Sequence, residues 1–261
     1  MVMSNRTCRV IVKVSRTLAS GLYDVARARE QFNREVSIVK GLNHPNIAEY
    51  LGVTDHLGQP AIIVAWYPHD NAPAFLMDRS IDIRLHVIKG VIEGLCYLHS
   101  KSPAIAHGDI RGNNVFVNNS FEGVLSDFAL SQVVDDGFTP PTDLADTMDK
   151  NGCIRWMARE LIYDEPEVPS PIGLTLASDT WAFGCTFYEL LLGQVPYSLR
   201  KKHFSHIIHD IVKGVFPFSK ADTTRVGCNE AWPVVSGCWR KVPGDRPSIF
   251  EIKAKLSHLY D

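Results

Sequence analysis

The sequence lacks several features that mark whole classes of protein. Its 261 residues carry a formal net charge of -2, so no general basic field exists to hold a nucleic acid or an anionic membrane. The longest apolar runs are too short to cross a bilayer, and no apolar stretch near the N-terminus is long enough for a signal peptide. There is no internal repeat, no low-complexity tract and no oligomer signal. We therefore expect a globular protein that binds no nucleic acid and has no membrane span.

Paired cysteines are also missing. None of the six cysteines belongs to a Cys-x-x-Cys pair, which argues against a zinc or thiol redox site. Their scatter suits a reduced compartment better than a disulfide framework, and we expect a cytoplasmic protein. His203, His206 and His209 recur every third residue. A metal site is conceivable there, but an exposed polar helix face is the simpler interpretation.

The first part of the chain predicts a small sheet with one helix. Val10–Val14 is a continuous β-branched run with Lys13 set into it, which indicates a strand. A helix is expected over 24–41, with Glu35 beside its apolar stripe, and two strands over 49–53 and 61–66. Residues 67–74 contain two prolines and are expected to be an irregular hinge.

The second part of the chain predicts a mainly helical unit. Short strands are expected at 115–117 and 124–126, and 131–152 reads as a long functional or disordered loop. Residues 163–173 are also expected to be loop. Helices are expected over 82–100, 177–192, 203–213, 230–241 and 248–260.

Residues 107–114, His-Gly-Asp-Ile-Arg-Gly-Asn-Asn, form a polar, glycine-bearing stretch between an apolar helix and a short apolar strand. The stretch presents a carboxylate, a long cation and an amide on a tight loop. A rigid scaffold of this kind can hold a reacting hydroxyl and a metal-bound phosphate in fixed geometry. Taken alone, the stretch is equally compatible with an ordinary helix-to-strand turn.

Several short motifs along the chain, in this order, decide between these interpretations. They are Lys13 in a strand, Glu35 in a helix, His107-Gly108-Asp109 through Asn114, Asp127-Phe128-Ala129, Ala158-Arg159-Glu160, Asp179-Thr180-Trp181-Ala182-Phe183-Gly184, and Cys238-Trp239 with Asp245-Arg246-Pro247. Together they resemble the protein-kinase signatures, over roughly residues 10–259. Trp156-Met157-Ala158 and Cys238-Trp239 are similar to the tyrosine-kinase-like serine/threonine kinases.

The resemblance implies an α+β, two-lobe kinase-like domain. Residues 1–67 would be a partial N-lobe of sheet plus helix, and residues 68–261 a mainly helical C-lobe. The implied activity is transfer of the γ-phosphate of ATP, with Mg²⁺, to a serine or threonine hydroxyl of a protein substrate. Tyrosine is not excluded as the acceptor.

The resemblance also implies a role for each matched residue of the phosphate site. Lys13 would contact the α- and β-phosphates, with Glu35 pairing to aim it. Asp127 and Asn114 would hold the metal, since a hard cation prefers oxygen ligands. Asp109 would accept or orient the proton of the acceptor hydroxyl. Arg111 would contact phosphate, because it stands two residues after Asp109, where many serine/threonine kinases carry a lysine.

Further matched positions concern the adenine ring. The backbone of Ala65 and Tyr67 would face the adenine, and Val64 would guard the rear of its pocket. Phe116 would lie under the ring where leucine is usual, and Ile11 stands where alanine is usual. Both are larger residues, so they could narrow the pocket.

Structural roles are implied for the remaining matches. Glu160 and Arg246 would form a buried ion pair, and Asp179 would bind the backbone of the catalytic loop. Three residues would stack in the packed column that links the lobes: Val39, His107 and Phe128.

The sequence departs from the family pattern at four places. No Gly-x-Gly-x-x-Gly precedes Lys13, and the twelve residues before it are too few for two strands and a loop. Ala129 replaces the glycine of DFG, which could limit flipping of that loop. Arg159 replaces the proline of APE. Gly108 replaces the arginine of HRD, which argues against strict control by phosphorylation of Thr139, Thr142 or Thr147.

These departures leave three interpretations open. The chain is an active kinase domain, a pseudokinase that acts as an interaction module with weak or absent ATP binding, or a fragment whose natural N-terminus carries the missing strands.

Overall fold

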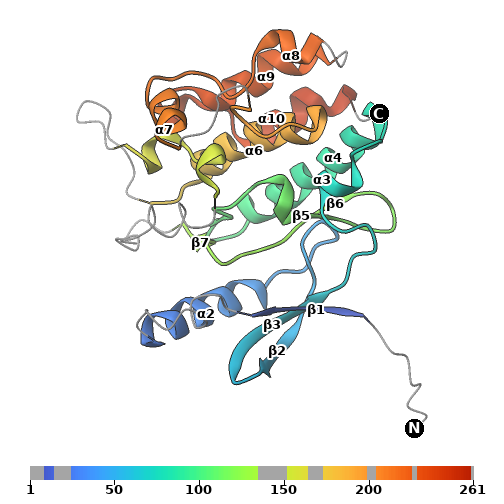
Figure 1. The fold of residues 1–261 in the computed structure, drawn as a ribbon, viewed down its shortest axis with the longest axis vertical. Coiled ribbons are helices and arrows are strands. Elements are labelled where there is room, and N and C mark those ends of the chain that lie inside the picture. Colours follow the sequence, from blue (N-terminus) through green and yellow to red (C-terminus); the bar gives the residue numbers. More distant parts are fainter. Residues whose placement is uncertain are drawn as a thin grey trace.

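The computed structural model describes residues 9–14, 25–134, 152–163, 173–198, 204–224 and 228–259. It has a small three-stranded sheet flanked by one helix and a larger helical part stacked beyond it (Figure 1). This is the expected two-lobe α+β architecture. The expected boundary at residue 67 stays a prediction.

The small sheet has the order β1-β3-β2, with every pair antiparallel. Its strands are β1 (Val10–Val14), β2 (Tyr50–His56) and β3 (Gln59–Ala65), which confirms the three expected strands. The register places Lys13 opposite Ile62 on the central strand. Helix α2 (Val25–Val39) runs beside the sheet (Figure 1) and carries Glu35 toward Lys13.

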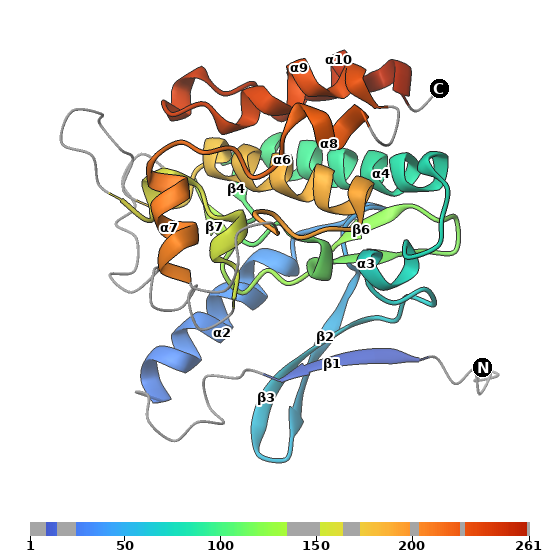
Figure 2. The same ribbon diagram turned by 45° about the horizontal axis from the view of Figure 1, so that its top comes forward.

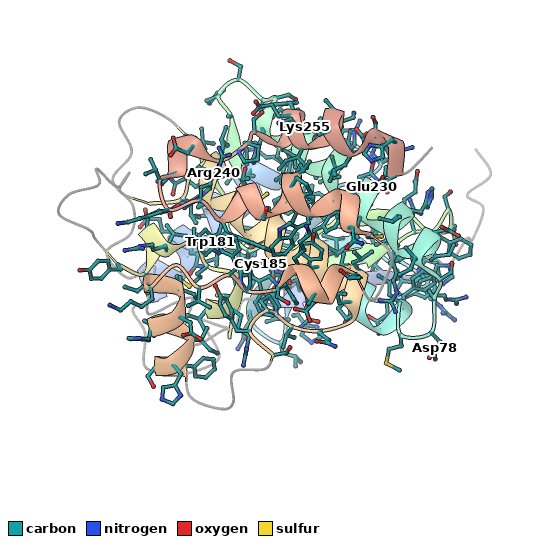
Figure 3. The ribbon with its side chains drawn as sticks, turned by 90° about the horizontal axis from the view of Figure 1, so that it is seen from above. Asp78, Trp181, Cys185, Glu230, Arg240 and Lys255 are labelled. Carbon is teal, nitrogen blue, oxygen red and sulfur yellow. The ribbon has the colours of Figure 1, made fainter. Side chains whose placement is uncertain are left out.

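The helical part is built on α4 (Ile81–His99), α6 (Leu176–Leu192) and α10 (Ile249–Leu256). Helices α4 and α6 lie next to each other under α10 (Figure 2), and α4 contacts both of the others. Trp181 and Cys185 of α6 lie in the interior, whereas Arg240 and Lys255 lie at the periphery (Figure 3). Helix α6 is therefore the centre of this core.

Helix α6 has well-defined ends. Thr175 and Ser178 form a capping box, in which each side chain accepts from the backbone N–H of the other residue. The helix ends at Gly193, whose φ of 67° is in the left-handed region that glycine adopts at low cost. Because both ends are fixed, side chains in the middle of α6 hold definite positions.

Two short strand pairs frame residues 107–114. Strand β4 (Ile105–Ala106) pairs with β7 (Gln132–Val133), and β5 (Val115–Val117) pairs with β6 (Gly123–Leu125). The loop leaves β4, makes the 3₁₀ turn η1 (Gly112–Asn114) and enters β5. The strands at 115–117 and 124–126 were expected, the second one residue later than observed, whereas the β4–β7 pair was not expected.

Two expectations about secondary structure were wrong. Residues 67–74 are not wholly irregular, because α3 (Ala72–Phe75) begins there with Asn71 as its N-cap. The single helix expected over 230–241 is broken into η4 (Asn229–Ala231), α9 (Trp232–Val235) and η5 (Ser236–Trp239). Pro233 fits only the first turn of a helix, so it starts a new short helix.

The remaining elements are short. They are η2 (Ile154–Trp156), η3 (Arg159–Leu161), α7 (Phe204–Val212), α8 (Lys220–Thr224), η6 (Pro243–Asp245) and η7 (Ser257–Leu259). Most of the two expected loops, 131–152 and 163–173, lies outside the described residues, as do Thr139, Thr142 and Thr147. Among the described helices, none combines the length and the apolar character that crossing a bilayer requires.

Candidate active site

Asp179 of α6 holds the loop of residues 107–114 through the loop backbone. The Asp179 carboxylate accepts the backbone N–H of His107 at 2.7 Å and that of Gly108 at 2.9 Å. It also pairs with Nε2 of His99 at 3.1 Å. Asp179 is buried, so these bonds are shielded from water. The expectation that Asp179 binds the backbone of this loop is confirmed.

Two further side chains of α6 bind the same loop, and sequence reasoning missed both. Thr186 Oγ1 donates to the carbonyl of Ile110 at 3.0 Å, and Glu189 Oε2 accepts from the N–H of Gly112 at 2.8 Å. Their spacing from Asp179 keeps all three on the loop side of the helix. Buried polar residues in an otherwise apolar helix were the available signal.

Asp109 is a buried carboxylate with a fixed orientation. Asn114 Nδ2 donates to Asp109 Oδ2 at 2.7 Å and to the Asp109 carbonyl at 2.8 Å. Nε of Arg111 lies 3.2 Å from Oδ1. Burial raises the pKa of Asp109, although Arg111 and Asn114 favour the charged form. A carboxylate with a raised pKa is a better proton acceptor than an exposed one.

His107 ties Asp109 to the segment around Asp127. Its Nδ1 accepts the N–H of Asp109 at 3.2 Å, so its Nε2 carries the proton and donates to the carbonyl of Ser126 at 3.1 Å. Burial lowers the pKa of His107 and keeps the ring neutral. The ring centroids of His107 and Phe128 lie 4.9 Å apart. Val39 and Phe128 belong to the same large apolar cluster, and the expected stacking of Val39 on these rings stays a prediction.

Lys13 joins α2 to Asp127. Its Nζ donates to Glu35 Oε1 at 2.7 Å and also forms an ion pair with Asp127. Burial alone would lower the pKa of Lys13, but the carboxylates of Asp127 and Glu35 outweigh it and raise that pKa. Burial raises the pKa of Glu35, and the Lys13 charge holds the pKa of Asp127 low despite burial. The expected Lys13–Glu35 pair is therefore formed.

The Asp127-Phe128-Ala129 turn accepts alanine without strain. Asp127 itself has a φ of 64°, in a region that aspartate tolerates better than most residues, whereas Ala129 has a negative φ. The Ala129 N–H reaches Asp127 Oδ1 at 3.4 Å, and Gln31 of α2 donates to the Ala129 carbonyl at 3.4 Å.

Only some of the residues expected around the adenine contact one another directly. Ile11 lies opposite Val64 in the register of β1 and β3, and Ala65 ends β3. The ring of Tyr67 stacks on that of Phe116 with centroids 5.6 Å apart and planes 13° from parallel. The Tyr67 hydroxyl accepts the N–H of Glu49 at 3.1 Å. Tyr67 and Phe116 thus form a stacked pair, and their joining with Ile11, Val64 and Ala65 around an adenine ring stays a prediction.

The space next to Gly108 is already filled. A Cβ at this position would lie 2.5 Å from Leu174 Cδ1 and 3.0 Å from the Leu130 carbonyl, and the φ of Gly108 is +82°. Leu174 belongs to a small apolar cluster that also contains Cys153, Ile154 and Met157. A side chain at this position would have to displace the Leu174 side chain, press on the Leu130 carbonyl and adopt an unfavourable positive φ.

The expected Glu160–Arg246 pair is confirmed as well. Two nitrogens of the Arg246 guanidinium reach the two carboxylate oxygens of Glu160, each at 2.6 Å. Arg246 also donates to the Ala177 carbonyl at 2.9 Å, and both charged side chains are almost wholly buried.

Metal binding in this region rests on few side chains. Among the described residues, no three His, Cys, Asp or Glu side chains converge as a metal site would require. His206 and His209 are exposed on α7, and His203 lies outside the described residues. Asn114 uses Nδ2 as a donor to Asp109, so its Oδ1 is the atom available to a cation. Asp127 and Asn114 can therefore contribute two oxygens, and phosphate would have to supply others.

Comparison with known proteins places the chain in a large group of relatives. Residues 2–256 match a family model described as protein tyrosine and serine/threonine kinase. A probable serine/threonine-protein kinase of Dictyostelium discoideum is 28% identical over 89% of this chain and 21% of its own length. The serine/threonine-protein kinase CTR1 of Arabidopsis thaliana is 27% identical over 88% and 26%.

A third relative is not named as a serine/threonine-protein kinase. Kinase suppressor of Ras A of Caenorhabditis elegans is 27% identical over 90% of this chain and 31% of its own length. The chain thus spans about a fifth to a third of these three relatives.

Proposed function

The chain belongs to the protein kinase family described as protein tyrosine and serine/threonine kinases, and we propose that it transfers the γ-phosphate of ATP to a serine or threonine hydroxyl of a protein. The single observation that carries this proposal is a continuous set of contacts. The Asn114 side chain donates to Asp109, and the Asn114 carbonyl accepts the N–H of Ser126. Asp127, which follows Ser126, pairs with Lys13.

Asp109 is the residue that we propose takes the proton of the acceptor hydroxyl. Its Oδ2 is engaged by Asn114, and its Oδ1 lies near Nε of Arg111, so the carboxylate cannot rotate freely. Burial favours the protonated form, which makes the carboxylate a stronger base. Arg111, held beside it, is proposed to attract phosphate charge.

Lys13, Glu35, Asp127 and Asn114 fit a magnesium-bound nucleotide. When bound, Mg-ATP supplies the phosphoryl group and the charge that neutralises it. Asp127 and Asn114 Oδ1 would hold the metal, and Lys13, aimed by Glu35, would contact the α- and β-phosphates. Val64, Ala65, Tyr67 and Phe116 are proposed to surround the adenine.

The choice of acceptor and the cellular setting are also proposals. Serine or threonine is supported by the names of the relatives in Dictyostelium and Arabidopsis. A protein substrate follows from the family. A cytoplasmic site is supported by the described cysteines, none of which is joined in a disulfide: Cys96, Cys153, Cys185, Cys228 and Cys238.

The experiment is transfer of labelled phosphate from Mg-ATP to the protein itself or to a generic substrate. We expect transfer by the natural chain and a loss of about 10²–10⁴-fold in Asp109→Asn. Asp78→Asn removes an exposed carboxylate and serves as the control. Natural-chain transfer no greater than that of Asp109→Asn would contradict the proposal.

A kinase-like interaction module is the second candidate. It is favoured by the stacked Tyr67 and Phe116 rings, together with Ile11, which put bulk around the adenine positions. The cost of overpacking is typically about 1–3 kcal/mol, and each 1.4 kcal/mol weakens binding about tenfold. This candidate predicts that the natural chain does not bind ATP and shows no transfer. It also predicts that Phe116→Leu restores ATP binding.

A further inference from the structure

Residues 66–71 form the linker between the small sheet and the helical part. The linker follows β3 and leads into α3, which lies beside β5 (Figure 1). The Asp70 carbonyl accepts the N–H of Val117 at 3.2 Å, and Asn71 forms an isolated antiparallel bridge with Phe116. The end of the linker is therefore attached to β5 through its backbone.

His69, within the linker, packs against two further rings. Its ring centroid lies 5.0 Å from that of Phe75 in α3 and 5.1 Å from that of Phe121 in the turn between β5 and β6. The Phe75 and Phe121 rings are stacked, with centroids 5.6 Å apart and planes 18° from parallel. Ring pairs at such distances attract each other beyond their simple burial. The three rings thus join the linker, α3 and the β5–β6 turn.

Phe121 reaches these rings from an unfavourable backbone conformation. Its φ is +61°, in the left-handed region where a bulky residue is rare and asparagine or glycine fits at lower cost. Asn118 fixes this turn, because its Oδ1 accepts the N–H groups of Ser120 and Glu122, each at 2.9 Å, and its carbonyl accepts that of Phe121 at 3.0 Å.

Filling a core does not explain the strained Phe121. The residue is 39% exposed, so much of its apolar surface stays in contact with water. A strained conformation that its surroundings over-determine points to a function for the side chain it presents. The contacts that this side chain makes are the rings of His69 and Phe75.

We propose that Phe121 is a latch, whose ring holds the linker against the helical part and restrains the movement of the small sheet. Phe121 belongs to the helical part, because its turn joins the paired strands β5 and β6, and β6 contacts α4. A ligand held between the two parts leaves when they separate, so the latch should slow its release. For Mg-ATP this consequence rests on the proposed function, whereas the latch itself is a property of the folded chain.

Hydrogen exchange of the full chain, followed by NMR, tests the latch without any ligand. The N–H of Val117 reports the attachment of the linker, because it donates to Asp70. Phe121→Asn suits the left-handed backbone and removes the ring. Relative to N–H groups in the middle of α6, which report global unfolding, exchange at Val117 should become about tenfold faster. An unchanged relative rate would overturn the proposal.

Leu57→Asn is the matched control for backbone strain. Leu57 has a φ of +55° in the turn between β2 and β3, and it is 91% exposed. The substitution relieves the same kind of strain without removing a packed ring, so the exchange of Val117 should not change. Faster exchange in Leu57→Asn would show that relief of strain alone loosens the linker, and would overturn the role of the ring.

His69→Ala tests the linker side of the same contact. It should speed the exchange of Val117 by a factor similar to that of Phe121→Asn, because either change removes the His69–Phe121 pair. In the double variant the two factors should not multiply, since the second change has no pair left to break. Factors that multiply fully would show that the two rings act independently, and would contradict the latch.

Release of a fluorescent ATP analogue with Mg²⁺ tests the consequence for a bound ligand. Phe121→Asn should raise the dissociation rate about tenfold, and Leu57→Asn should leave it unchanged. An unchanged rate in Phe121→Asn would refute the effect of the latch on release. If the natural chain does not bind the analogue, the proposed function fails, while hydrogen exchange still decides the latch.

Discussion

The two halves of the candidate site are held in different ways. On the loop side, α6 contributes three buried side chains, Asp179, Thr186 and Glu189, which bind backbone groups. On the proposed nucleotide side, the side chains of Lys13 and Asp127 are 32% and 35% exposed and meet through an ion pair.

The two halves differ in the interactions that hold their side chains in place. Buried hydrogen bonds to backbone form as the helical part folds, because leaving those groups unpaired would be costly. Partly exposed ion pairs contribute little and are screened by salt. The loop side is therefore fixed by folding, whereas the side of Lys13 and Asp127, where we propose that phosphate and metal bind, is less constrained. The following predictions test this contrast through the free energy of unfolding, from the largest expected effect to the smallest.

Breaking the buried pair of the helical part should have the largest effect. Glu160→Ala leaves the Arg246 guanidinium buried without its carboxylate, and we expect a loss of about 3–5 kcal/mol. Urea denaturation measures it. Glu93→Ala is the matched control, because its pair with Lys253 is partly exposed and should be worth less than about 1 kcal/mol. Similar losses in the two variants would contradict the contrast between buried and exposed pairs.

Removing the charge of Glu189 should change how stability depends on pH. The pKa of Glu189 is raised from 4.5 to about 7, so its folded form favours the proton. Its contribution to stability is present below pH 4.5 and is lost as pH rises through 7. Relative to the natural chain, Glu189→Gln should therefore gain up to about 3 kcal/mol between acidic and mildly alkaline pH. Urea denaturation across this range measures the gain, and a constant difference would show that the carboxylate is not perturbed.

Lys13→Met should affect stability less but strongly reduce the proposed transfer. Its ion pairs are partly exposed, so we expect a change of about 1 kcal/mol in unfolding. Labelled-phosphate transfer should nevertheless fall at least about 100-fold, because the nucleotide loses its cation. Unfolding and transfer are measured on the same preparation. A large loss of stability would mean that the small sheet depends on Lys13 to fold.

Ala129→Gly should give the smallest change. Ala129 has a negative φ, so alanine fits there, and glycine adds freedom to the unfolded chain. We expect a loss of about 0.4–1 kcal/mol in thermal or urea unfolding. A stabilised variant would instead show that alanine is strained at this position.

Much of the site could be predicted from the order of the motifs. Asp109, Asn114 and Asp127 stand between predictable elements, and the Lys13 strand is marked by its β-branched neighbours. The pairing of Glu160 with Arg246 followed from the family pattern and is present in the structure. These predictions depend on local sequence or on matched positions.

What could not be predicted depends on tertiary packing. Thr186 and Glu189 lie in a helix whose apolar character predicts only core, and their partners are far away in sequence. The absence of a side chain at Gly108 was visible, but the leucines that fill its space were not. The broken helix after Cys228 was missed because the apolar period outweighed Pro233.

Binding of Mg-ATP tests the division between the two halves most directly. A thermal-shift titration should show a saturable rise in Tm for the natural chain, because a ligand that binds only the folded state stabilises it. The rise should persist in Asp109→Asn, which alters the loop side, and disappear in Asp127→Asn, which alters the nucleotide side. No rise in the natural chain, or an undiminished rise in Asp127→Asn, would contradict the assignment.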